Sequence, residues 1–418
     1  MGIADEVRAW LDTNWDTSIT LREWWRRLAD SGYAFPTWPT ELGGLGVKPS
    51  VAREINEVLG ERGVISPPEG MGPNMAFPTI LANGTAEQAR RFALSIATGE
   101  SAWCQLFSEP GAGSDLAAVG TKAIRDGDEF IVTGQKVWNS GAETADKGML
   151  LVRTNPDMPK HRGMSYVIID MQQPGVEVRP LVQMNRGTEF CEVFLTEARV
   201  RVDDVIGGID NGWGVARTTL AAERSMAASG RSRKMAAVTA GQIAGNLDRT
   251  VAEVVARWES SQRDTKRRAG VLLNSRAMIS LAKKTGCNTD PVTRQDLADY
   301  WCRSEVYRLT NKRVSDNAKA GKVGPEGSIG KLGLAMLAHR SRDLSLRMLG
   351  ASSMLMDDDA PSGGWVQLAG LSSHMPSIGG GTNEIQRTVI GEQALGLPRE
   401  PSTDNDIPFK DLLRSRNT

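Results

Sequence analysis

The residues with the clearest chemical potential form one short run, Phe107-Ser108-Glu109-Pro110-Gly111-Ala112-Gly113-Ser114-Asp115-Leu116. Glycine permits positive φ angles and a close approach of the backbone to a ligand. Successive backbone N–H groups in such a loop can surround an anionic or polar ligand atom. The run therefore predicts a ligand-binding loop, although a tight surface turn would use the same residue types.

Composition excludes several other kinds of chemistry. The 418 residues contain 50 Lys and Arg and 50 Asp and Glu, so the formal net charge is zero. A general binder of nucleic acid or of anionic membranes is expected to be more basic. No apolar run reaches the roughly 18 residues of a transmembrane helix, and the start of the chain lacks a secretion-signal pattern. We expect a cytoplasmic protein that binds neither nucleic acid nor membrane.

Histidine and cysteine are scarce. Only three histidines occur, which makes a His-based triad or a His-rich metal site unexpected. The four cysteines, Cys104, Cys191, Cys287 and Cys302, lie far apart without the spacing of metal ligands. The sequence therefore predicts reduced thiols and no metal site.

The elements that must position the loop fall into three parts. Residues 1–103 read as a helical domain, because apolar residues recur at three and four positions. Residues 104–209 contain short β-branched runs bounded by Gly, Pro or Asp, which indicate a β domain. Residues 210–418 return to long helical periodicity. The predicted fold class is α+β, with an N-terminal helical domain, a central antiparallel β domain and a C-terminal antiparallel helix bundle.

Individual segments support this division. Asp126-Gly127-Asp128 predicts a hairpin turn before a strand at residues 130–133. The C-terminal periodicity predicts helices over residues 212–229, 297–316 and 330–349.

Four motifs occur in order along these three parts. They are Pro39-Thr40-Glu41-Leu42-Gly43-Gly44, Ser108-Glu109-Pro110-Gly111-Ala112-Gly113-Ser114-Asp115, Gly134-Gln135-Lys136-Val137-Trp138-Asn139-Ser140-Gly141-Ala142 and Gly381-Thr382-Asn383-Glu384-Ile385-Gln386-Arg387. Together with the order of helical and β parts, they resemble the acyl-CoA dehydrogenase family of flavoenzymes over nearly the whole chain. The resemblance implies an acyl-CoA substrate and an FAD held between the β domain and the C-terminal bundle.

The resemblance also implies roles for residues of the β domain. Ser108, helped by Phe107, would face the polar edge of the flavin ring. Ser140 would hydrogen-bond flavin N5, the atom that receives hydride, and Trp138 would pack on the ring. Ser114 would lie near the pantetheine arm of CoA.

The reaction of this family needs a base, because the proton on Cα of an acyl thioester is only weakly acidic. Many members carry it as the Glu of a Tyr-Glu-Gly-Thr run, but the matching run here has Gly380, which has no side chain. A branch of the family carries the base on an earlier helix, after a Gly-x-x-Val start and before an Arg. The segment Gly212–Arg224 is similar to that helix and places Glu223 at the position of the base. The alternative interpretation of Glu223 is an exposed helix carboxylate.

The neighbours of these two positions have implied roles of their own. Arg224 would stabilise the dimer or the charges around the substrate, without transferring a proton. The backbone N–H of Gly380 would donate to the thioester oxygen as charge develops there. The run from Gly379 to Gly381 removes bulk beside the acyl group, which would suit a branched, cyclic or otherwise bulky chain. A flexible turn without influence on the substrate is the alternative.

Binding of the FAD phosphates is less clearly encoded. The Arg, Phe-Gly and Gln that contact the pyrophosphate in many members are not found as a run. Arg347 could contact a phosphate by charge-assisted hydrogen bonds. Thr382 and Glu384, in the C-terminal signature, are also expected on the cofactor side.

Three functions remain open at this point. The first is FAD-dependent α,β-dehydrogenation of an acyl-CoA, with an electron-transferring flavoprotein as acceptor and a dimer or tetramer of like or unlike chains. The second is a non-catalytic or half-site partner subunit of a heteromeric acyl-CoA dehydrogenase. The third is an acyl-CoA oxidase, which would produce peroxide under oxygen.

Overall fold

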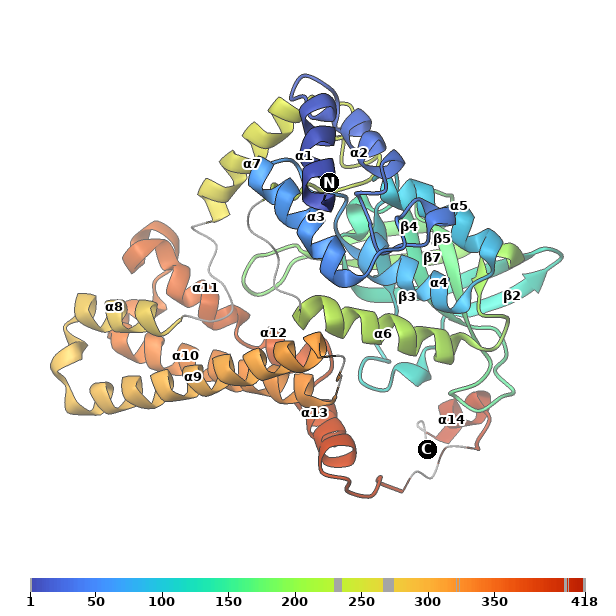
Figure 1. Ribbon diagram of the computed structural model, residues 1–418. Helices are drawn as coiled ribbons and strands as arrows, with labels where there is room; N and C mark the ends of the chain where they lie inside the picture. The colour runs from blue at the N-terminus through green and yellow to red at the C-terminus, as the bar shows by residue number, and fades with distance from the viewer. Residues whose placement is uncertain are drawn as a thin grey trace.

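The chain folds into helices, then a sheet, then further helices (Figure 1). The computed structural model describes residues 2–228, 235–265, 274–320, 322, 324–401, 404 and 406–415. The order of the elements confirms the predicted fold class.

The N-terminal helices enclose two buried tryptophans. These helices are α1 (Ile3–Asn14), α2 (Leu21–Asp30), α3 (Pro49–Arg62), α4 (Phe77–Asn83) and α5 (Ala86–Ala97), with the short helices η1 (Thr40–Leu42) and η2 (Gly72–Ala76). Trp24 and Trp25 have no exposed surface, and their indole N–H groups donate to the carbonyls of Ile65 (3.0 Å) and Ser66 (2.8 Å). Because their polar atoms are satisfied, these large side chains can stabilise the core fully.

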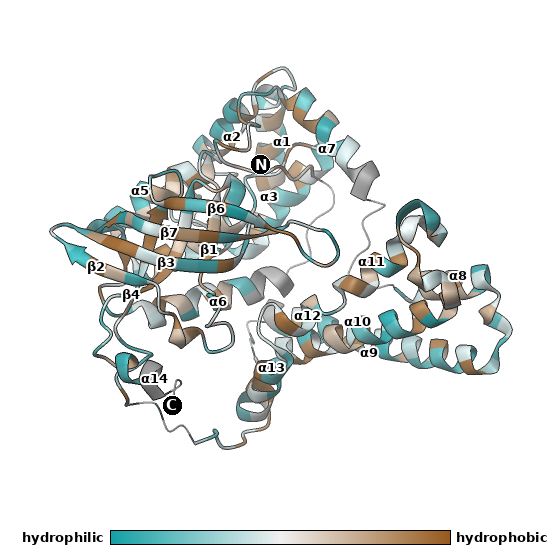
Figure 2. Cartoon of the chain, turned by 180° about the vertical axis from the view of Figure 1, so that it is seen from behind, coloured by the Kyte–Doolittle hydropathy of each residue, from teal (hydrophilic) through white to brown (hydrophobic). Residues whose placement is uncertain are grey.

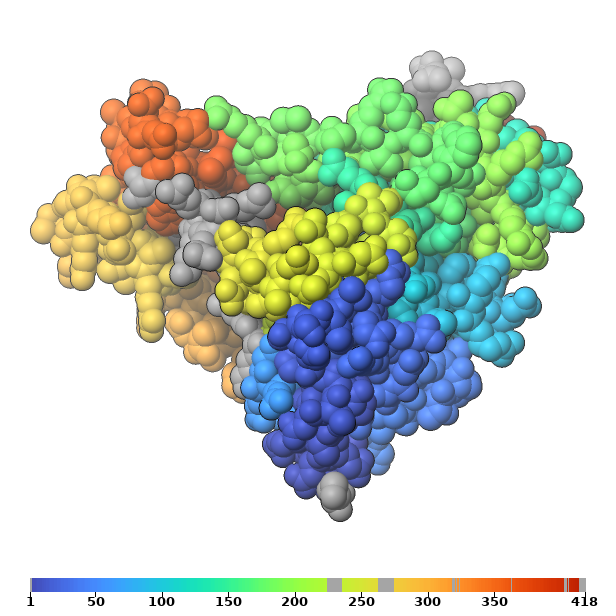
Figure 3. Space-filling model, turned by 90° about the horizontal axis from the view of Figure 1, so that it is seen from above, coloured from blue at the N-terminus to red at the C-terminus, as the bar shows by residue number. Residues whose placement is uncertain are grey.

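Helix α7 (Val251–Thr265) lies with the N-terminal helices, although it comes much later in the chain. In Figure 3 this helix, drawn in yellow, lies against the blue N-terminal segment. Leu247 and Val251 are buried in the same apolar cluster as Trp24. The segment before and at the start of α7 therefore completes the N-terminal core, whereas the domain boundaries at residues 103 and 209 stay predictions.

The middle of the chain forms a single sheet. In the part of the chain that the structure describes, its eight strands are β1 (Trp103–Leu106), β2 (Lys122–Asp126), β3 (Glu129–Ser140), β4 (Lys147–Arg153), β5 (Met164–Asp170), β6 (Val176–Leu181), β7 (Phe190–Arg201) and β8 (Val205–Ile206). Their order is β6-β7-β3-β2-β4-β5-β8, and β1 pairs with β4. The pairs β1–β4 and β2–β4 are parallel and the others antiparallel. The predicted turn at Gly127, with φ 61°, joins β2 to β3.

Residues of β4 point alternately into two cores. Met149 and Leu151 pack with the N-terminal helices, whereas Leu150 and Val152 pack with side chains of β3 and β7. Successive side chains of a strand point to opposite faces of the sheet. Strand β4 is therefore covered by helices on one face and by the β3–β7 ribbon on the other, which Figure 2 shows from behind.

Helix α6 (Gly212–Ala228) packs on α4 and β5. Its residues Val215 and Ala216 are buried in the cluster that also holds Phe77 of α4 and Tyr166 of β5. The predicted helix over residues 212–229 is thus confirmed as far as residue 228, and it covers the sheet.

The remaining helices form a bundle beside the other two parts. They are α8 (Ser275–Thr285), α9 (Pro291–Lys319), α10 (Glu326–Leu349), α11 (Trp365–Ser372), α12 (Met375–Ile378) and α13 (Asn383–Val389). Helix α14 (Phe409–Ser415) instead returns to the loop between β4 and β5 (Figure 1). Tyr300 of α9 and Leu344 of α10 lie in the core of the bundle. None of the helices within the described residues combines the length and the apolar character needed to cross a bilayer.

Candidate functional site

A buried ion pair anchors the Ser-Glu-Pro corner of the loop after β1. Lys136 Nζ lies 2.8 Å from Glu109 Oε1 and also donates to the carbonyls of Phe107 (3.0 Å) and Leu151 (2.8 Å). The side chain of Lys136 has no exposed surface, and 14% of the Glu109 side chain is exposed. With all three ammonium hydrogens directed at acceptors, the pair fixes the backbone at residue 107 to strand β3.

The same carboxylate is surrounded by further donors. The Thr121 hydroxyl donates to Glu109 Oε1 at 2.6 Å, and the backbone N–H groups of Gly120 and Thr121 donate at 2.7 and 2.9 Å. Burial alone would raise the pKa of Glu109, but the Lys136 ammonium and these hydrogen bonds outweigh it and hold that pKa below its usual value. The corner is therefore built around a carboxylate that is ionised in the folded protein near neutral pH.

Phe107 and Ser108 occupy different environments. Phe107 is buried, with its ring 5.9 Å from the ring of Tyr166. Ser108 is half-buried, and its carbonyl accepts a hydrogen bond from Val137 N–H at 3.0 Å. Phe107 is thus a core residue that supports the position of Ser108, and the contact of Ser108 with a flavin stays a prediction.

Strand β3 carries an irregularity at Trp138. The register with β7 shifts between Lys136 and Asn139, and Trp138 adopts φ 66°, which costs a non-glycine residue roughly 1 kcal/mol. A bulge of this kind re-aims a side chain. Trp138 is 56% exposed. Its ring makes a T-shaped contact with the ring of Phe190, with 5.8 Å between the two ring centroids. The backbone strain therefore coincides with a large aromatic surface that faces outward.

Asn139, the next residue, ties the end of β3 to β1. Its Nδ2 donates to the carbonyl of Gln105 at 2.7 Å. Its Oδ1 is buried and has no partner among the described residues. An unpaired buried acceptor is costly, so this atom marks a place where a bound group could contribute a donor.

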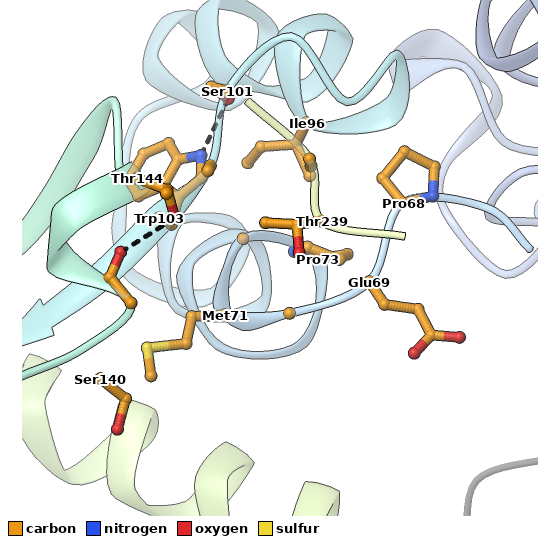
Figure 4. Close-up of a pocket in the computed structure, with 15 residues that line it drawn as sticks. Pro68, Glu69, Met71, Pro73, Ile96, Ser101, Trp103, Ser140, Thr144 and Thr239 are labelled. Atoms are coloured by element: carbon orange, nitrogen blue, oxygen red, sulfur yellow. Dashed lines mark hydrogen bonds between the residues drawn. The ribbon is translucent and has the colours of Figure 1, made fainter. Parts of the chain in front are cut away.

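A pocket of about 200 Å³ opens beside the end of β3 (Figure 4). Its lining residues are Pro68, Glu69, Gly70, Met71, Gly72, Pro73, Ile96, Ser101, Ala102, Trp103, Ser140, Gly141, Thr144, Thr239 and Ala240. Most of these side chains are apolar, and Ser140 and Thr144 supply hydroxyls from one wall. Such a pocket suits an apolar group attached to a polar one.

Helix η2 forms part of this wall and limits the size of the pocket. A Cβ added at Gly72 would lie 2.8 Å from Cδ1 of Trp103, so only glycine fits without a shift. The indole N–H of Trp103 donates to Ser101 Oγ at 2.9 Å, which fixes the ring. Glycine at residue 72 thus allows the helix to approach the ring closely.

Glu223 lies on the inward face of α6. Thr219, one turn earlier, is fully buried and its hydroxyl bonds to Thr79 (2.9 Å) and to the Tyr166 hydroxyl (3.2 Å). Residues four apart on a helix share a face, and Glu223 is half-buried. Helix α6 packs against η2, and in Figure 4 the Ser140 side chain lies on the side of the pocket that faces the pale green α6. Helix η2 therefore connects the two: it contacts α6, which carries Glu223, and it lines the same pocket as Ser140 at the end of β3.

The glycine turn lies between α12 and α13. Gly380 and Gly381 have φ 65° and 89°, and a Cβ at Gly380 would meet nothing within 4 Å. Gly379 and Gly380 are exposed, and within the described residues the Gly380 N–H has no hydrogen-bond partner. A donor in an open turn is thus available, held within the C-terminal helices.

Thr382 and Glu384 have clear local roles. The Thr382 side chain caps α13 by accepting a hydrogen bond from Ile385 N–H at 3.3 Å. Glu384 forms an ion pair with Arg387 at 3.3 Å, and hydrogen bonding at the start of the helix lowers its pKa. Contacts of these two residues with a cofactor stay predictions.

The other predicted residues are dispersed. Arg347 on α10 forms an ion pair with Asp296 of α9, and Asp296 also pairs with Arg340 at 2.7 Å. The guanidinium of Arg347 is therefore already paired within the bundle. Ser114 is exposed in the loop after β1. The side chain of Arg224 lies outside the described residues.

Comparison with known proteins identifies the family. Models of the acyl-CoA dehydrogenase N-terminal, middle and C-terminal domains match residues 3–100, 104–198 and 267–395. Acyl-CoA dehydrogenase IpdE1 of Mycobacterium tuberculosis is 33% identical over 379 residues, which cover 91% of this chain and 88% of the relative. The chain belongs to the acyl-CoA dehydrogenase family. It is an oxidoreductase of this flavoprotein family, as the motifs predicted.

Other members of the family are also similar. Acyl-CoA dehydrogenase FadE34 of M. tuberculosis is 35% identical over 378 residues, 89% of this chain but only 46% of FadE34, so the chain spans about half of that relative. Among solved structures, the Tcur3481-Tcur3483 steroid ACAD matches with TM-score 0.65 and 25% identity, over 95% of this chain and 97% of that one. The ChsE4-ChsE5 complex of M. tuberculosis matches with TM-score 0.61 and 27% identity, over the same shares.

Sequence reasoning missed several residues that build the site. Lys136 lay inside a quoted motif, but nothing in the sequence showed that it is buried against Glu109. The wall from Gly70 to Pro73 carries no periodic or chemical signal. Lys331 could have been suspected only as a cation on α10, which α11 and α12 separate from the glycine turn along the chain.

Proposed function

We propose that this chain catalyses FAD-dependent α,β-dehydrogenation of an acyl-CoA whose acyl group is bulky, with Glu223 as the base. The observation that carries the proposal is the half-buried position of Glu223 on the inward face of α6, beside the helix η2 that walls a largely apolar pocket. Ser140, at the end of β3, lines the same pocket. A carboxylate, an apolar pocket and a strand end with hydroxyl groups are the parts that this reaction needs.

The residues around β3 fit a flavin. Trp138 offers an exposed aromatic ring, Ser108 and Ser140 offer hydroxyls, and Asn139 Oδ1 is a buried acceptor in need of a donor. Aromatic rings stack well on planar groups, and these residues would hold the ring system beside the end of β3. When bound, FAD supplies the acceptor for the hydride from Cβ.

The other residues have separate roles in proton transfer, in stabilising the thioester oxygen and in binding the substrate. Glu223 accepts the proton from Cα of the thioester, which makes it the general base. The N–H of Gly380 donates to the thioester oxygen and stabilises the charge that develops there. Ser114, in the exposed loop after β1, contacts the pantetheine arm, and Arg224 belongs to the charge network around the substrate.

A bulky acyl group follows from two features. The pocket of about 200 Å³ is lined mainly by apolar side chains. The run from Gly379 to Gly381, which the family resemblance assigns to the acyl group, has no side chains that would fill space beside it. The solved relative Tcur3481-Tcur3483 is a steroid ACAD. The acyl chain is therefore branched or cyclic. An electron-transferring flavoprotein would serve as the electron acceptor.

A half-site subunit of a heteromeric acyl-CoA dehydrogenase is the second candidate. Arg347, the residue expected at an FAD phosphate, is engaged by Asp296. The similar structures include a complex of two different chains, ChsE4 and ChsE5. In this arrangement a partner chain completes the phosphate site.

Anaerobic titration of the purified chain with a panel of acyl-CoAs separates the two candidates. The enzyme is expected to be yellow, and its flavin absorbance should bleach fastest with branched or cyclic acyl-CoAs. Fastest bleaching by short linear acyl-CoAs would contradict the substrate class. A colourless chain that acquires flavin only with a second chain would favour the half-site subunit. Peroxide formation under oxygen would instead indicate an oxidase.

A further inference from the structure

Lys331, on the second turn of α10, reaches the glycine turn. Its Nζ donates to the carbonyl of Pro376 in α12 and to the carbonyl of Gly381 at 2.5 Å. The side chain is half-buried, and burial lowers its pKa while Glu384 opposes that effect. One ammonium thus bridges the two ends of the segment that contains Gly379 and Gly380.

Gln386 adds two further hydrogen bonds to the turn. This buried side chain on α13 donates through Nε2 to the carbonyls of Gly380 (3.0 Å) and Gly381 (3.4 Å). A Cβ at Gly381 would lie only 2.7 Å from that nitrogen, so glycine is needed for the contact. The carbonyls of Gly380 and Gly381 therefore both accept hydrogen bonds, while the N–H of Gly380 has no partner within the described residues.

Three successive glycines would otherwise sample many conformations. Glycine loses more conformational freedom on ordering than any other residue. A donor that stabilises developing charge is effective only when it is oriented before the reaction. Contacts from outside the turn must restrict it, and Lys331 supplies two of them from a long helix, to the carbonyls of Pro376 and Gly381 on either side of Gly380.

We propose that Lys331 is a positioning residue, which holds the Gly379–Gly381 turn so that the Gly380 N–H points at the thioester oxygen. This inference rests on the proposed function, because it assigns a task to the oxyanion donor of that reaction. Lys331 itself does not touch the substrate. Its loss should weaken thioester polarisation more than ligand binding.

The first test compares Lys331→Met, Lys331→Arg and the control Lys312→Met under anaerobic single turnover. Lys312 lies on the surface of α9 in a pair with Asp316. With the acyl-CoA that bleaches the wild type fastest, Lys331→Met should slow flavin reduction about tenfold or more, while the dissociation constant changes less. Lys331→Arg should recover part of the rate, because a guanidinium can still donate to both carbonyls, and Lys312→Met should match the wild type.

The second test reads the turn directly. Hydrogen exchange of the backbone amides in residues 376–387 should rise in Lys331→Met and stay unchanged in Lys312→Met. The absorption band of bound 3-phenylacryloyl-CoA should shift to longer wavelength on the wild type, and this shift should shrink in Lys331→Met. Unchanged exchange, or an unchanged rate and band shift, would overturn the role of Lys331. A wild type that no acyl-CoA bleaches would instead overturn the proposed function.

Discussion

Lys136 and Glu109 place opposite charges where almost no water reaches them. Taking charges out of water is expensive, and the cost is recovered only when the geometry and the additional hydrogen bonds are good. Both conditions hold, since Lys136 has three acceptors and Glu109 has four donor groups around it. Removing either partner therefore leaves an uncompensated charge beside the loop that carries Ser108.

We predict that Glu109→Gln lowers the free energy of unfolding by about 3 kcal/mol at pH 7, because the buried Lys136 loses its counter-charge. The folded-state pKa of Glu109 lies below its usual value. Its contribution to stability is therefore present above the unfolded pKa and lost as the pH falls through the folded pKa. Urea unfolding should show the wild type and the variant converging below about pH 4.5.

The matched control for this experiment is Glu61→Gln. Glu61 is 57% exposed and pairs with Arg8 at 3.5 Å on the surface. Such pairs contribute less than about 1 kcal/mol. A difference between Glu109→Gln and wild type that does not vary with pH would contradict the role assigned to the ionised carboxylate.

A second prediction concerns Trp138 and its proposed contact with the flavin. Replacing it with glycine removes the strain at φ 66°, so we expect the free energy of unfolding to stay within about 1 kcal/mol of the wild type. FAD affinity should fall, because the exposed ring is lost. Flavin release measured by fluorescence tests this, with the equally exposed surface residue Trp301 (52%) changed to alanine as the control. Unaltered FAD binding in Trp138→Gly would contradict flavin packing.

At the scale of elements, the short helix η2 connects the parts of the site. It lines the pocket, contacts α6 and approaches the Trp103 ring through Gly72. The position of this single helix therefore sets both the width of the pocket and the distance between the pocket and Glu223.

Gly72→Ala should narrow the pocket. The new methyl group would meet Trp103 at 2.8 Å, and overpacking of this kind costs about 1–3 kcal/mol. We predict a drop of about tenfold or more in kcat/KM for bulky acyl-CoAs relative to short ones, with FAD binding retained. Gly327→Ala is the control, since a Cβ at this helical glycine of α10 meets nothing within 4 Å. Equal losses for bulky and short substrates would refute the assignment of this wall.

The elements differ in how well the sequence predicts them. Long periodic segments, such as those of α9 and α10, and the turn at Gly127 carry local signals that packing does not override. Helix η2 has five residues and no period, so its place in the pocket depends on contacts with Trp103 and α6. The role of Glu223 was predicted from motif register, and the position of its helix adds the half-burial that no spacing could show.

At the scale of the whole molecule, residues from distant parts of the chain complete each domain. Leu247 and Val251 are buried with N-terminal tryptophans. The C-terminal strap (residues 406–412) returns to the β domain, where Phe409 N–H donates to the carbonyl of Met158 at 2.9 Å. Lys160 pairs with both Asp115 (3.2 Å) and Asp404 (2.7 Å), which links a residue just before the strap to the loop after β1. These long-range contacts have no local sequence signal.

The strap should be stabilised mainly by Phe409. This residue is 5% exposed, and Cζ of Arg153 lies 4.0 Å from the centroid of its ring. Burial lowers the pKa of the Arg153 guanidinium to about 10. Phe409→Ala should cost about 3 kcal/mol locally, which raises amide exchange in the strap roughly 100-fold. Mass spectrometry of peptides covering residues 155–162 and 406–412 checks this, and Leu395→Ala, at a position 68% exposed, is the control. Exchange that stays at the wild-type level would show that the strap does not depend on this ring.

The central claim is that Glu223 removes the α-proton, and changing it to glutamine tests the claim most directly. Stopped-flow mixing of Glu223→Gln with the best acyl-CoA should show binding but a flavin reduction rate at least about 1,000-fold below the wild type, within the range that a general base contributes. Glu223→Asp should recover part of the rate, and Glu259→Gln, at an exposed position on α7, should match the wild type. Flavin bleaching by Glu223→Gln at the wild-type rate would contradict the account.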